Sequence, residues 1–444
     1  MRTCGTQFVT VDGVPVRLRG VCIGGWLNME NFITGYAANE SLMRKAVSSV
    51  IGEDRAEKFF ETLLDSFFSD ADAAFLADSG FNVVRLPVNY RHLENDGRPF
   101  EIIQGGFDRL DRAIAQLGAR GIYTVIDLHA LPGCQNHHWH SDNQTHVASF
   151  WEHPHFQDRV VNLWQVLADR YRKNPSVAGY NLMNEPADES RIVVGPFYRR
   201  LTAAIREIDT EHILFLDGNT YATEFDIFDD GADNTVYTLH DYVPAGIGRS
   251  RSYDRDAARQ KFLKRSAYAR STGTPIFVGE FGSIYTGQPD DDEQRFRILV
   301  DQLELYAEHE ASWTIWTYKD LGRQGLVMVQ PQSPYRRHFD EFVTKKERLG
   351  ADQWGSDGEG VAEVTRPVQD LVARECPHFD PYPWGRFDWV RTLLLNILVA
   401  QPLAYEYAQL FARLDDDELA ALAKSFSFAE CEIRMPLLDR LKAS

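Results

Sequence analysis

Eight short apolar runs, spaced along the first 320 residues and separated by longer amphipathic stretches, limit the possible folds of this chain most. They span residues 16–24, 81–88, 122–130, 177–184, 212–218, 235–242, 274–282 and 311–319. Each is apolar on both faces, as a strand inside a parallel sheet must be. The stretches between them have a helical period: Leu110, Ile114 and Leu117 share one face before Gly121. Eight strand–helix units predict an α/β fold, a (β/α)8 TIM barrel, rather than an open doubly wound sheet.

The pattern changes after residue 319. Residues 350–360 form a break rich in glycine and aspartate, and the remainder has helical patterns interrupted by prolines. The acidic run Asp415–Asp417 is typical of a helix start. We therefore predict a catalytic barrel over residues 1–349, beginning with a short hairpin that turns at Asp12–Gly13. A helical extension over residues 350–444 is expected to pack on it.

Charge and cysteine content exclude several classes of protein. The net charge is -18, from 47 Lys and Arg against 65 Asp and Glu, which disfavours nucleic acid and anionic membranes as partners. Five cysteines without a C-x-x-C pair indicate neither a disulfide framework nor a zinc site. No signal-peptide pattern begins the chain, and Arg391 and Pro402 interrupt the most apolar late segment. The sequence predicts a cytoplasmic protein that does not bind membranes, and leaves its oligomeric state open.

Six of the eight predicted strands end in groups suited to charged chemistry. Because the carboxyl ends of barrel strands meet at one face, we expect these side chains to lie together. On these six strands they are Arg85, Asp127, His129, Asn184, Glu185, Asp217, His240, Tyr242 and Glu280, and the eighth strand adds Trp316.

Glu185 and Glu280 are the most informative pair. They close the fourth and seventh runs, so that folding must bring them together across the barrel mouth. Two opposed carboxyls are what glycoside hydrolysis needs: a protonated one for the leaving oxygen, and an ionised one that attacks the anomeric carbon or activates water. We expect Glu185 to be the acid, with its pKa raised by the nearby negative charge of Glu280.

The neighbouring side chains fit this division of labour. Arg85 and Tyr242 are expected to hold Glu280 as a carboxylate, since a cation and a hydroxyl donor favour the charged form. Asn184 is expected to bond a sugar hydroxyl next to the reacting carbon. His129, His240 and Trp316 are expected to shape the pocket. The predicted substrate-binding residues at the strand ends are thus Arg85, His129, Asn184, His240, Tyr242 and Trp316.

Taken in order, these residues resemble glycoside hydrolase family 5, whose members are retaining (β/α)8 glycosidases. The family pattern has Arg, His, Asn-Glu, His-x-Tyr, Glu and Trp after successive strands. The matching residues are Arg85, His129, Asn184, Glu185, His240, Tyr242, Glu280 and Trp316. The resemblance covers residues 15–320 and implies that Glu185 is the acid/base and Glu280 the nucleophile. It says nothing specific about the extension.

Two loops add candidates. The segment 133–146 holds His137, His138, His140 and His146, but their spacing follows no metal-ligand rule. We therefore predict no metal and no cofactor, and interpret this loop as a wall of a sugar site in which Trp139 stacks and His140 bonds hydroxyls. The segment 20–36 offers Trp26, Asn28 and Glu30 after two adjacent glycines. Trp26 is expected to stack on a sugar, with a packed loop as the alternative.

The expected function is retaining hydrolysis of 1,2-trans glycosides by two glutamates. Long insertions at 131–155 and 320–340, with the C-terminal helices, favour an exo-acting pocket for small glycosides or oligosaccharides. The enzyme would be of the β-glucosidase or exo-glucanase type. The segments "GGWLNMENFITGY" and "WHSDN" also resemble subfamily 13, which implies α-L-arabinofuranosides or β-D-galactofuranosides. An endo-acting β-glucanase or cellulase, a non-catalytic carbohydrate-binding barrel and a metal-dependent barrel hydrolase remain as alternatives.

Overall fold

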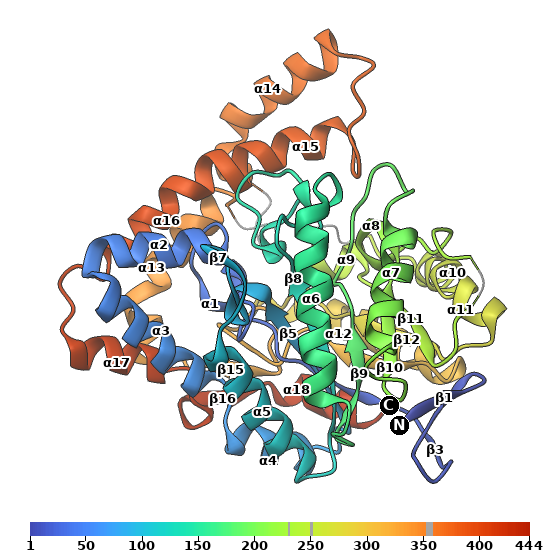
Figure 1. The fold of residues 1–444 in the computed structure, drawn as a ribbon. Helices are drawn as coiled ribbons and strands as arrows, with labels where there is room; N and C mark the ends of the chain where they lie inside the picture. The colour runs from blue at the N-terminus through green and yellow to red at the C-terminus, as the bar shows by residue number, and fades with distance from the viewer. Residues whose placement is uncertain (230, 249–251, 352–357) are drawn as a thin grey trace.

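The computed structural model describes residues 1–229, 231–248, 252–351 and 358–444. Its centre is a closed barrel of eight parallel strands, in the order β4-β5-β8-β9-β10-β11-β12-β13 (Figure 1). The strands are β4 (Arg19–Cys22), β5 (Val83–Asn89), β8 (Tyr123–Ala130), β9 (Val177–Asn181), β10 (Ile213–Asp217), β11 (Thr235–His240), β12 (Phe277–Glu280) and β13 (Ser312–Ile315). All eight predicted strands are present, and the predicted fold class is confirmed.

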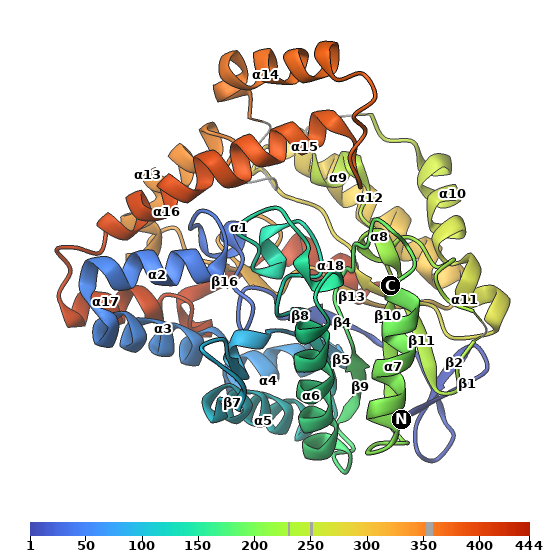
Figure 2. The same ribbon diagram turned by 45° about the horizontal axis from the view of Figure 1, so that its top comes forward.

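Helices cover the outside of the barrel (Figures 1 and 2). They are α1 (Asn31–Thr34), α2 (Glu40–Ile51), α3 (Glu53–Phe67), α4 (Asp70–Asp78), α5 (Gln104–Gly118), α6 (Pro154–Tyr171), α7 (Val194–Arg206), α8 (Asn219–Ala222), α9 (Pro244–Ile247), α10 (Arg255–Arg265), α11 (Ala267–Thr272) and α12 (Pro289–Glu308). Each longer helix buries one face; in α6 this face includes Val160, Leu163 and Leu167. A two-stranded hairpin, β6 (Glu94–Asn95) and β7 (Arg98–Ile102), follows β5.

The amino-terminal hairpin closes the lower end of the barrel. Strands β2 (Gln7–Val9) and β3 (Pro15–Val16) pair antiparallel around a turn in which Gly13 has a φ of 77°, which confirms the predicted hairpin. Strand β1 (Arg2–Cys4) adds a third strand that was not predicted. Phe8 packs on Phe215 and Phe277 with ring centroids 6.1 and 6.2 Å apart. This apolar plug leaves the opposite, carboxyl end of the strands for a polar site.

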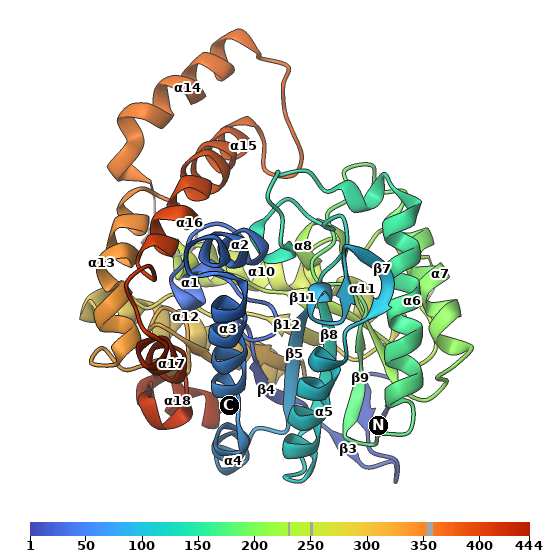
Figure 3. The same cartoon turned by 60° about the vertical axis from the view of Figure 1, so that its left-hand side comes forward.

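The C-terminal part packs along the helices that follow β4. It contains α14 (Ala362–Glu375), α15 (Arg386–Thr392), a π-helical turn (Leu393–Val399), α16 (Ala400–Gln409), α17 (Asp416–Lys424) and α18 (Met435–Lys442). Helix α16 lies beside α2, and α17 beside α3 (Figure 3). Residues 352–357, in the centre of the predicted break, lie outside the described residues, and the division between residues 349 and 350 stays a prediction.

The prediction of a purely helical extension is wrong, because the extension also contains a strand. Strand β16 (Cys431–Ile433) pairs antiparallel with β15 (Val327–Val329), which in turn pairs with β14 (Lys319–Asp320) directly after the barrel. Helix α13 (Pro334–Arg348) follows β15. The segment Cys431–Ile433 is too short to form a stable helix, and it pairs instead with the free edge of β15.

A buried lysine links the barrel to the extension. Lys319 is fully buried, and its ammonium donates to the carbonyl of Phe67 at 2.6 Å, to Asp72 at 2.7 Å and to the carbonyl of Phe426 at 2.9 Å. A buried ammonium needs all of its donors satisfied, and here one acceptor comes from the extension. Among the described helices, none has the length and apolar character of a membrane span.

Candidate active site

A cavity of about 340 Å³ opens at the carboxyl end of the barrel strands. It brings together eight of the eleven predicted site residues: His129, Trp139, His140, Glu185, His240, Tyr242, Glu280 and Trp316. Trp26, Arg85 and Asn184 are not part of its lining. The strand-end reasoning therefore located the site, but three of the predicted substrate contacts need another role.

Glu280 is held by a permanent cation and a phenol. Nη1 of Arg85 lies 2.6 Å from Oε1 of Glu280, and the hydroxyl of Tyr242 donates to Oε2 at 2.9 Å. Burial acts to lower the pKa of Arg85, but the negative charges of Asp127 and Glu280 outweigh it and raise the pKa. Burial and the charge of Glu280 also raise the pKa of Tyr242, so this hydroxyl stays a donor. The predicted contacts of Glu280 are present.

The prediction that Arg85 binds substrate is wrong. Its side chain is fully buried, and its nitrogens all bond to other protein side chains. Nε donates to Asn181 at 2.9 Å, and Nη2 donates to Asn184 at 2.7 Å and pairs with Asp127 at 3.1 Å. Asn184 also lies below the cavity surface, with its amide nitrogen 3.3 Å from Nε2 of His129. Both residues position the groups above them, and a direct bond from Asn184 to a sugar stays a prediction.

Glu185 has imidazole partners instead. Nδ1 of His240 lies 2.6 Å from Oε1, and Nε2 of His140 lies 3.1 Å from Oε2. The backbone of Glu185 is left-handed, with a φ of 47°, which costs a non-glycine residue conformational energy. Its N–H donates to the carboxylate of Asp217 at 3.0 Å. Asp217, together with Pro186 directly after Glu185, thus helps to fix the direction of the Glu185 side chain.

The expected rise in the pKa of Glu185 is wrong for this arrangement. Burial acts to raise the pKa, but the hydrogen bonds with His140 and His240 outweigh burial and hold it well below its ordinary value. Burial acts to lower the pKa of His240, but the charges of Glu280 and Glu185 raise it. The proton of this pair therefore lies on the imidazole, beside the carboxylate that has to deliver it.

The two glutamates face each other across His240. One oxygen of each carboxylate and a ring nitrogen of His240 all lie within 4.8 Å of one another. The register of the strands produces this, since β11 pairs with β12 so that His240 is opposite Glu280. The backbone N–H of Asp241 also donates to the carbonyl of Glu280 at 2.8 Å. The ends of β11 and β12 are therefore fixed relative to each other.

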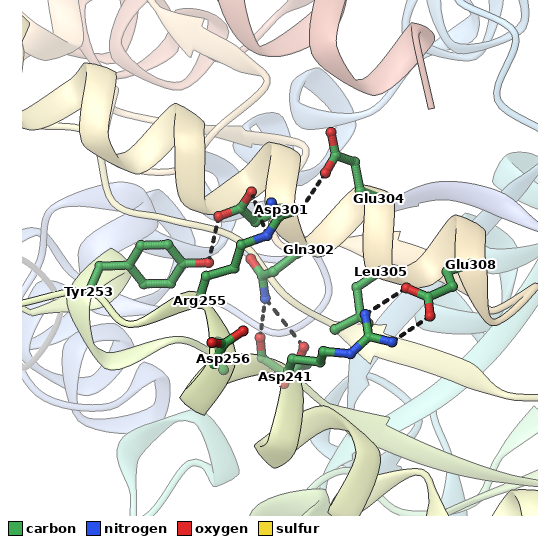
Figure 4. A pocket seen from close by; sticks show the side chains of 11 residues that line it. Asp241, Tyr253, Arg255, Asp256, Asp301, Gln302, Glu304, Leu305 and Glu308 are labelled. Atoms are coloured by element: carbon green, nitrogen blue, oxygen red, sulfur yellow. Dashed lines mark hydrogen bonds and ion pairs between the residues drawn. The ribbon is translucent and has the colours of Figure 1, made fainter.

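Asp241 anchors this strand end on the side away from the cavity. Its carboxylate accepts from the hydroxyl of Tyr306 at 2.9 Å, and its carbonyl accepts from the amide of Gln302 at 2.6 Å. Figure 4 shows Gln302 reaching Asp241 in a groove whose rim is crossed by the ion pairs of Arg255 and Arg259 with α12. Because side chains alternate along an extended chain, this outward anchor lets His240 and Tyr242 both face the cavity.

The floor of the cavity is a stacked pair next to a carboxylate. The rings of His129 and Trp316 lie 5.4 Å apart and 12° from parallel. Burial acts to lower the pKa of His129, but Asp127, whose carboxylate is 2.7 Å from Nδ1, raises it to about 10. Glu30 is 4% exposed, and its Oε1 is a buried atom without a hydrogen-bond partner in the structure. Burial raises the pKa of Glu30.

The prediction that Trp26 stacks on a sugar is wrong. The side chain is 1% exposed, its Nε1 donates to the carbonyl of Leu64 at 2.7 Å, and its ring packs on Phe68. The preceding glycines serve the site differently: a Cβ on Gly24 would lie 2.6 Å from the ring of Trp316. From the block 20–36 it is thus Glu30 that reaches the cavity. The packed-loop alternative holds for Trp26.

The histidine loop forms a wall, with Trp139 and His140 in the cavity lining. His138 stacks on His140, and burial lowers its pKa well below the ordinary value. Within the described part of the chain, three potential metal ligands approach closely enough for one ion only at Glu185, His240 and Glu280. Stacking of Trp139 on a sugar stays a prediction.

Eight further residues of the cavity lining were not predicted: Tyr221, Thr223, Pro244, Ile247, Lys261, Arg265, Trp384 and Asp388. Tyr221 lies in the left-handed segment Thr220–Ala222, where φ is between 53° and 59°, and no local sequence signal marks such a conformation. Trp384 and Asp388 come from the extension, about a hundred residues after Glu280. Only the tertiary fold brings them to the barrel mouth.

Comparison with known proteins agrees with the fold. A β-xylosidase of Phanerodontia chrysosporium is 44% identical over 97% of this chain and 95% of its own length. A probable glucan 1,3-β-glucosidase A of Aspergillus terreus is 26% identical over 70% of this chain and 85% of its own. The structure of the cellulose synthase subunit Z of Clostridioides difficile matches with a TM-score of 0.53, at 18% identity, over 70% and 94% of the two chains. The model for cellulase (glycosyl hydrolase family 5) matches residues 59–322, and the chain belongs to this family of glycoside hydrolases.

Proposed function

We propose that this glycoside hydrolase acts with retention of configuration and removes a single terminal sugar from small β-glycosides. The observation that carries the mechanism is the approach of the Glu185 and Glu280 carboxylates to within 4.8 Å. Retaining enzymes hold their carboxyls about 5–5.5 Å apart, whereas inverting enzymes need roughly 6.5–9.5 Å to admit a water molecule. The spacing here suits direct attack on the anomeric carbon.

In the first step, Glu280 attacks the anomeric carbon while the bond to the leaving oxygen breaks. Glu185 gives that oxygen its proton, which it draws from His240 at 2.6 Å. In the second step, Glu185 takes a proton from water and passes it back to His240, the water oxygen bonds to the anomeric carbon, and the ester bond to Glu280 breaks. The sugar leaves with its original configuration, and both carboxyls return to their starting state.

The walls of the cavity support exo action. Glu30 lines the cavity with a buried carboxylate whose nearest cationic group is Nε2 of His129, 3.5 Å from its Oε1, and such an acceptor suits the hydroxyls of a sugar that has no further residue attached. Trp139 and the side chains from the extension add walls that an open cleft would lack. The names of the relatives, β-xylosidase and glucan 1,3-β-glucosidase, favour pyranosides such as β-D-xylosides and β-D-glucosides over the furanosides of subfamily 13.

A panel of nitrophenyl glycosides tests the sugar: β-D-xyloside, β-D-glucoside, β-D-mannoside, α-L-arabinofuranoside and β-D-galactofuranoside. We expect the first two to be hydrolysed best, and furanoside preference would refute the pyranoside proposal. Oligosaccharides labelled at the reducing end should lose one sugar at a time, whereas internal cleavage would indicate an endo-acting glucanase. Proton NMR of the first-formed anomer should show retention, and an inverted anomer before mutarotation would refute the mechanism.

A further inference from the structure

The C-terminal extension forms part of the cavity wall. Residues 376–385, here called the arm, connect α14 to α15 and descend toward α8 (Figures 1 and 2). Trp384, in the arm, and Asp388, in the first turn of α15, both line the cavity. Trp384 is 49% exposed, although its indole lies beside a concave site rather than on an open surface. Such a side chain offers a large apolar face to whatever enters the cavity.

A series of contacts places Trp384 on the side of Glu185. His140 lies 3.1 Å from the carboxylate of Glu185, and its ring meets the ring of Tyr221 at a centroid distance of 6.2 Å. The ring of Tyr221 in turn lies 5.4 Å from Trp384, tilted by 33°. Glu30, His129 and Trp316 form the floor, where the ring of His129 lies 5.9 Å from that of His140. The arm is therefore linked to the acid through the rings of Tyr221 and His140.

This position has a chemical meaning that rests on the proposed function. The acid protonates the oxygen of the leaving group, so the rest of the leaving group must extend over the acid's side of the cavity. We infer that Trp384 and Asp388 form the binding site for a sugar leaving group, with the indole stacked on its ring and the carboxylate accepting from one of its hydroxyls. A flat apolar face beside a hydroxyl acceptor is the surface that a sugar ring matches.

Asp388 has a free capacity for such a bond. The Asp388 carboxylate has no hydrogen bond or ion pair with another described residue. Burial raises the pKa of this carboxyl. A partly desolvated carboxylate gains from a hydroxyl donor. Arg391 and His146 both lie close enough to favour the charged form of this carboxylate, which shares the wall with Trp384.

The arm is anchored to the same loops that carry the acid. The hydroxyl of Tyr382 lies 2.9 Å from that of Thr220, at the start of the left-handed segment. The N–H of Tyr221 lies 3.2 Å from the carbonyl of Pro186, directly after Glu185. The indole and the acid are thus held at a fixed separation, as a site for the leaving group requires.

The test compares three substrates with the same glycosyl group: a disaccharide, a nitrophenyl glycoside and the glycosyl fluoride. In Trp384→Ala, kcat/KM for the disaccharide should fall about 10-fold, because the stacking contact and the apolar area that it buries are both lost. The nitrophenyl glycoside, which has a flat ring but no hydroxyls, should also lose activity. The fluoride has no ring to stack and should keep its kcat/KM within about twofold. Asp388→Asn should lower only the disaccharide reaction, by about 10-fold.

Phe387→Ala is the matched control. Phe387 precedes Asp388 in α15, is exposed and does not line the cavity. It should leave all three reactions unchanged, and circular dichroism should show that each variant is folded. An equal loss on all three substrates in Trp384→Ala, or no loss on the disaccharide, would overturn this inference while leaving the proposed function in place. A wild-type enzyme that hydrolyses none of the three would overturn both.

Discussion

The two sides of the cavity use opposite means to control a glutamate. Glu280 is bonded to a guanidinium that stays charged and to a phenol that stays protonated. Glu185 is bonded to two imidazoles, those of His140 and His240, and to no permanent cation. A nucleophile needs one permanent charge state, whereas an acid/base must change state twice in each cycle. The difference between the partners thus fits the roles that we propose for two chemically identical side chains.

The strongest test of this comparison is Glu280→Gln. The amide keeps the shape of the side chain and can still meet Tyr242, but it cannot attack the anomeric carbon. We expect kcat to fall by roughly 10⁴-fold or more on every substrate, as for removal of a nucleophile elsewhere. End-point assays over several hours measure the residual kcat, and a thermal melt verifies that the variant is folded. Residual activity within about tenfold of wild type would assign the nucleophile to another group.

Glu185→Ala should be selective where Glu280→Gln is not. Loss of a general acid typically costs about 10²–10⁴-fold, but only where the leaving group needs a proton. We expect a large fall for a disaccharide, little fall in the glycosylation rate for a dinitrophenyl glycoside, and a glycosyl azide of retained configuration when azide is added. Equal losses for good and poor leaving groups would remove Glu185 from this role.

Tyr242→Phe weakens the hold on Glu280 without removing it. A hydrogen bond to a charged group contributes about 1.5–3 kcal/mol, so kcat/KM should fall by roughly 10–100-fold. The loss should be similar for good and poor leaving groups, because the nucleophile acts on both. A loss confined to poor leaving groups would place Tyr242 with the acid instead.

The smallest effect should be a shift in pH dependence on the acid's side. The raised pKa of His240 keeps the shared proton on the pair to a higher pH, and acid catalysis is lost as the pH rises through it. In His240→Asn only Glu185 carries that proton, so the basic limb of kcat/KM for a disaccharide should move to lower pH. Tyr242→Phe is the control and should keep the basic limb in place. An unmoved limb in His240→Asn would refute the shared proton.

The sequence was sufficient to predict the barrel and the positions of both glutamates. Parallel strands are apolar throughout, so a polar group at the end of each stands out, and all of these ends meet at one rim. It was not sufficient for side-chain direction. Trp26 follows a strand as Trp316 does, but turns its indole into the helix layer, bonded to Leu64. Whether a loop residue faces the cavity is decided by packing that no local pattern encodes.

Local sequence patterns could predict neither the protonation state of Glu185 nor the part that the extension takes in the cavity wall. The pKa of Glu185 depends on His140, in the loop after β8, and on His240, at the end of β11. An argument from the charge of Glu280 alone predicted the wrong direction. Trp384 lies in a segment without helical or strand period, and its contact with Tyr221 depends on a left-handed turn far away in the chain. Such contacts are properties of the assembled fold.

The buried ammonium of Lys319 has a consequence for protein engineering. One of its three acceptors, the carbonyl of Phe426, comes from the extension, and β16 covers the edge of β15. A chain shortened to the family match, residues 59–322, would leave this ammonium short of an acceptor. It would also lack β4, which would leave the edges of β5 and β13 unpaired. The whole chain should then melt in one calorimetric transition, and grafting the catalytic barrel alone onto another scaffold should yield an aggregating protein. The recognisable family segment is thus shorter than the unit that folds.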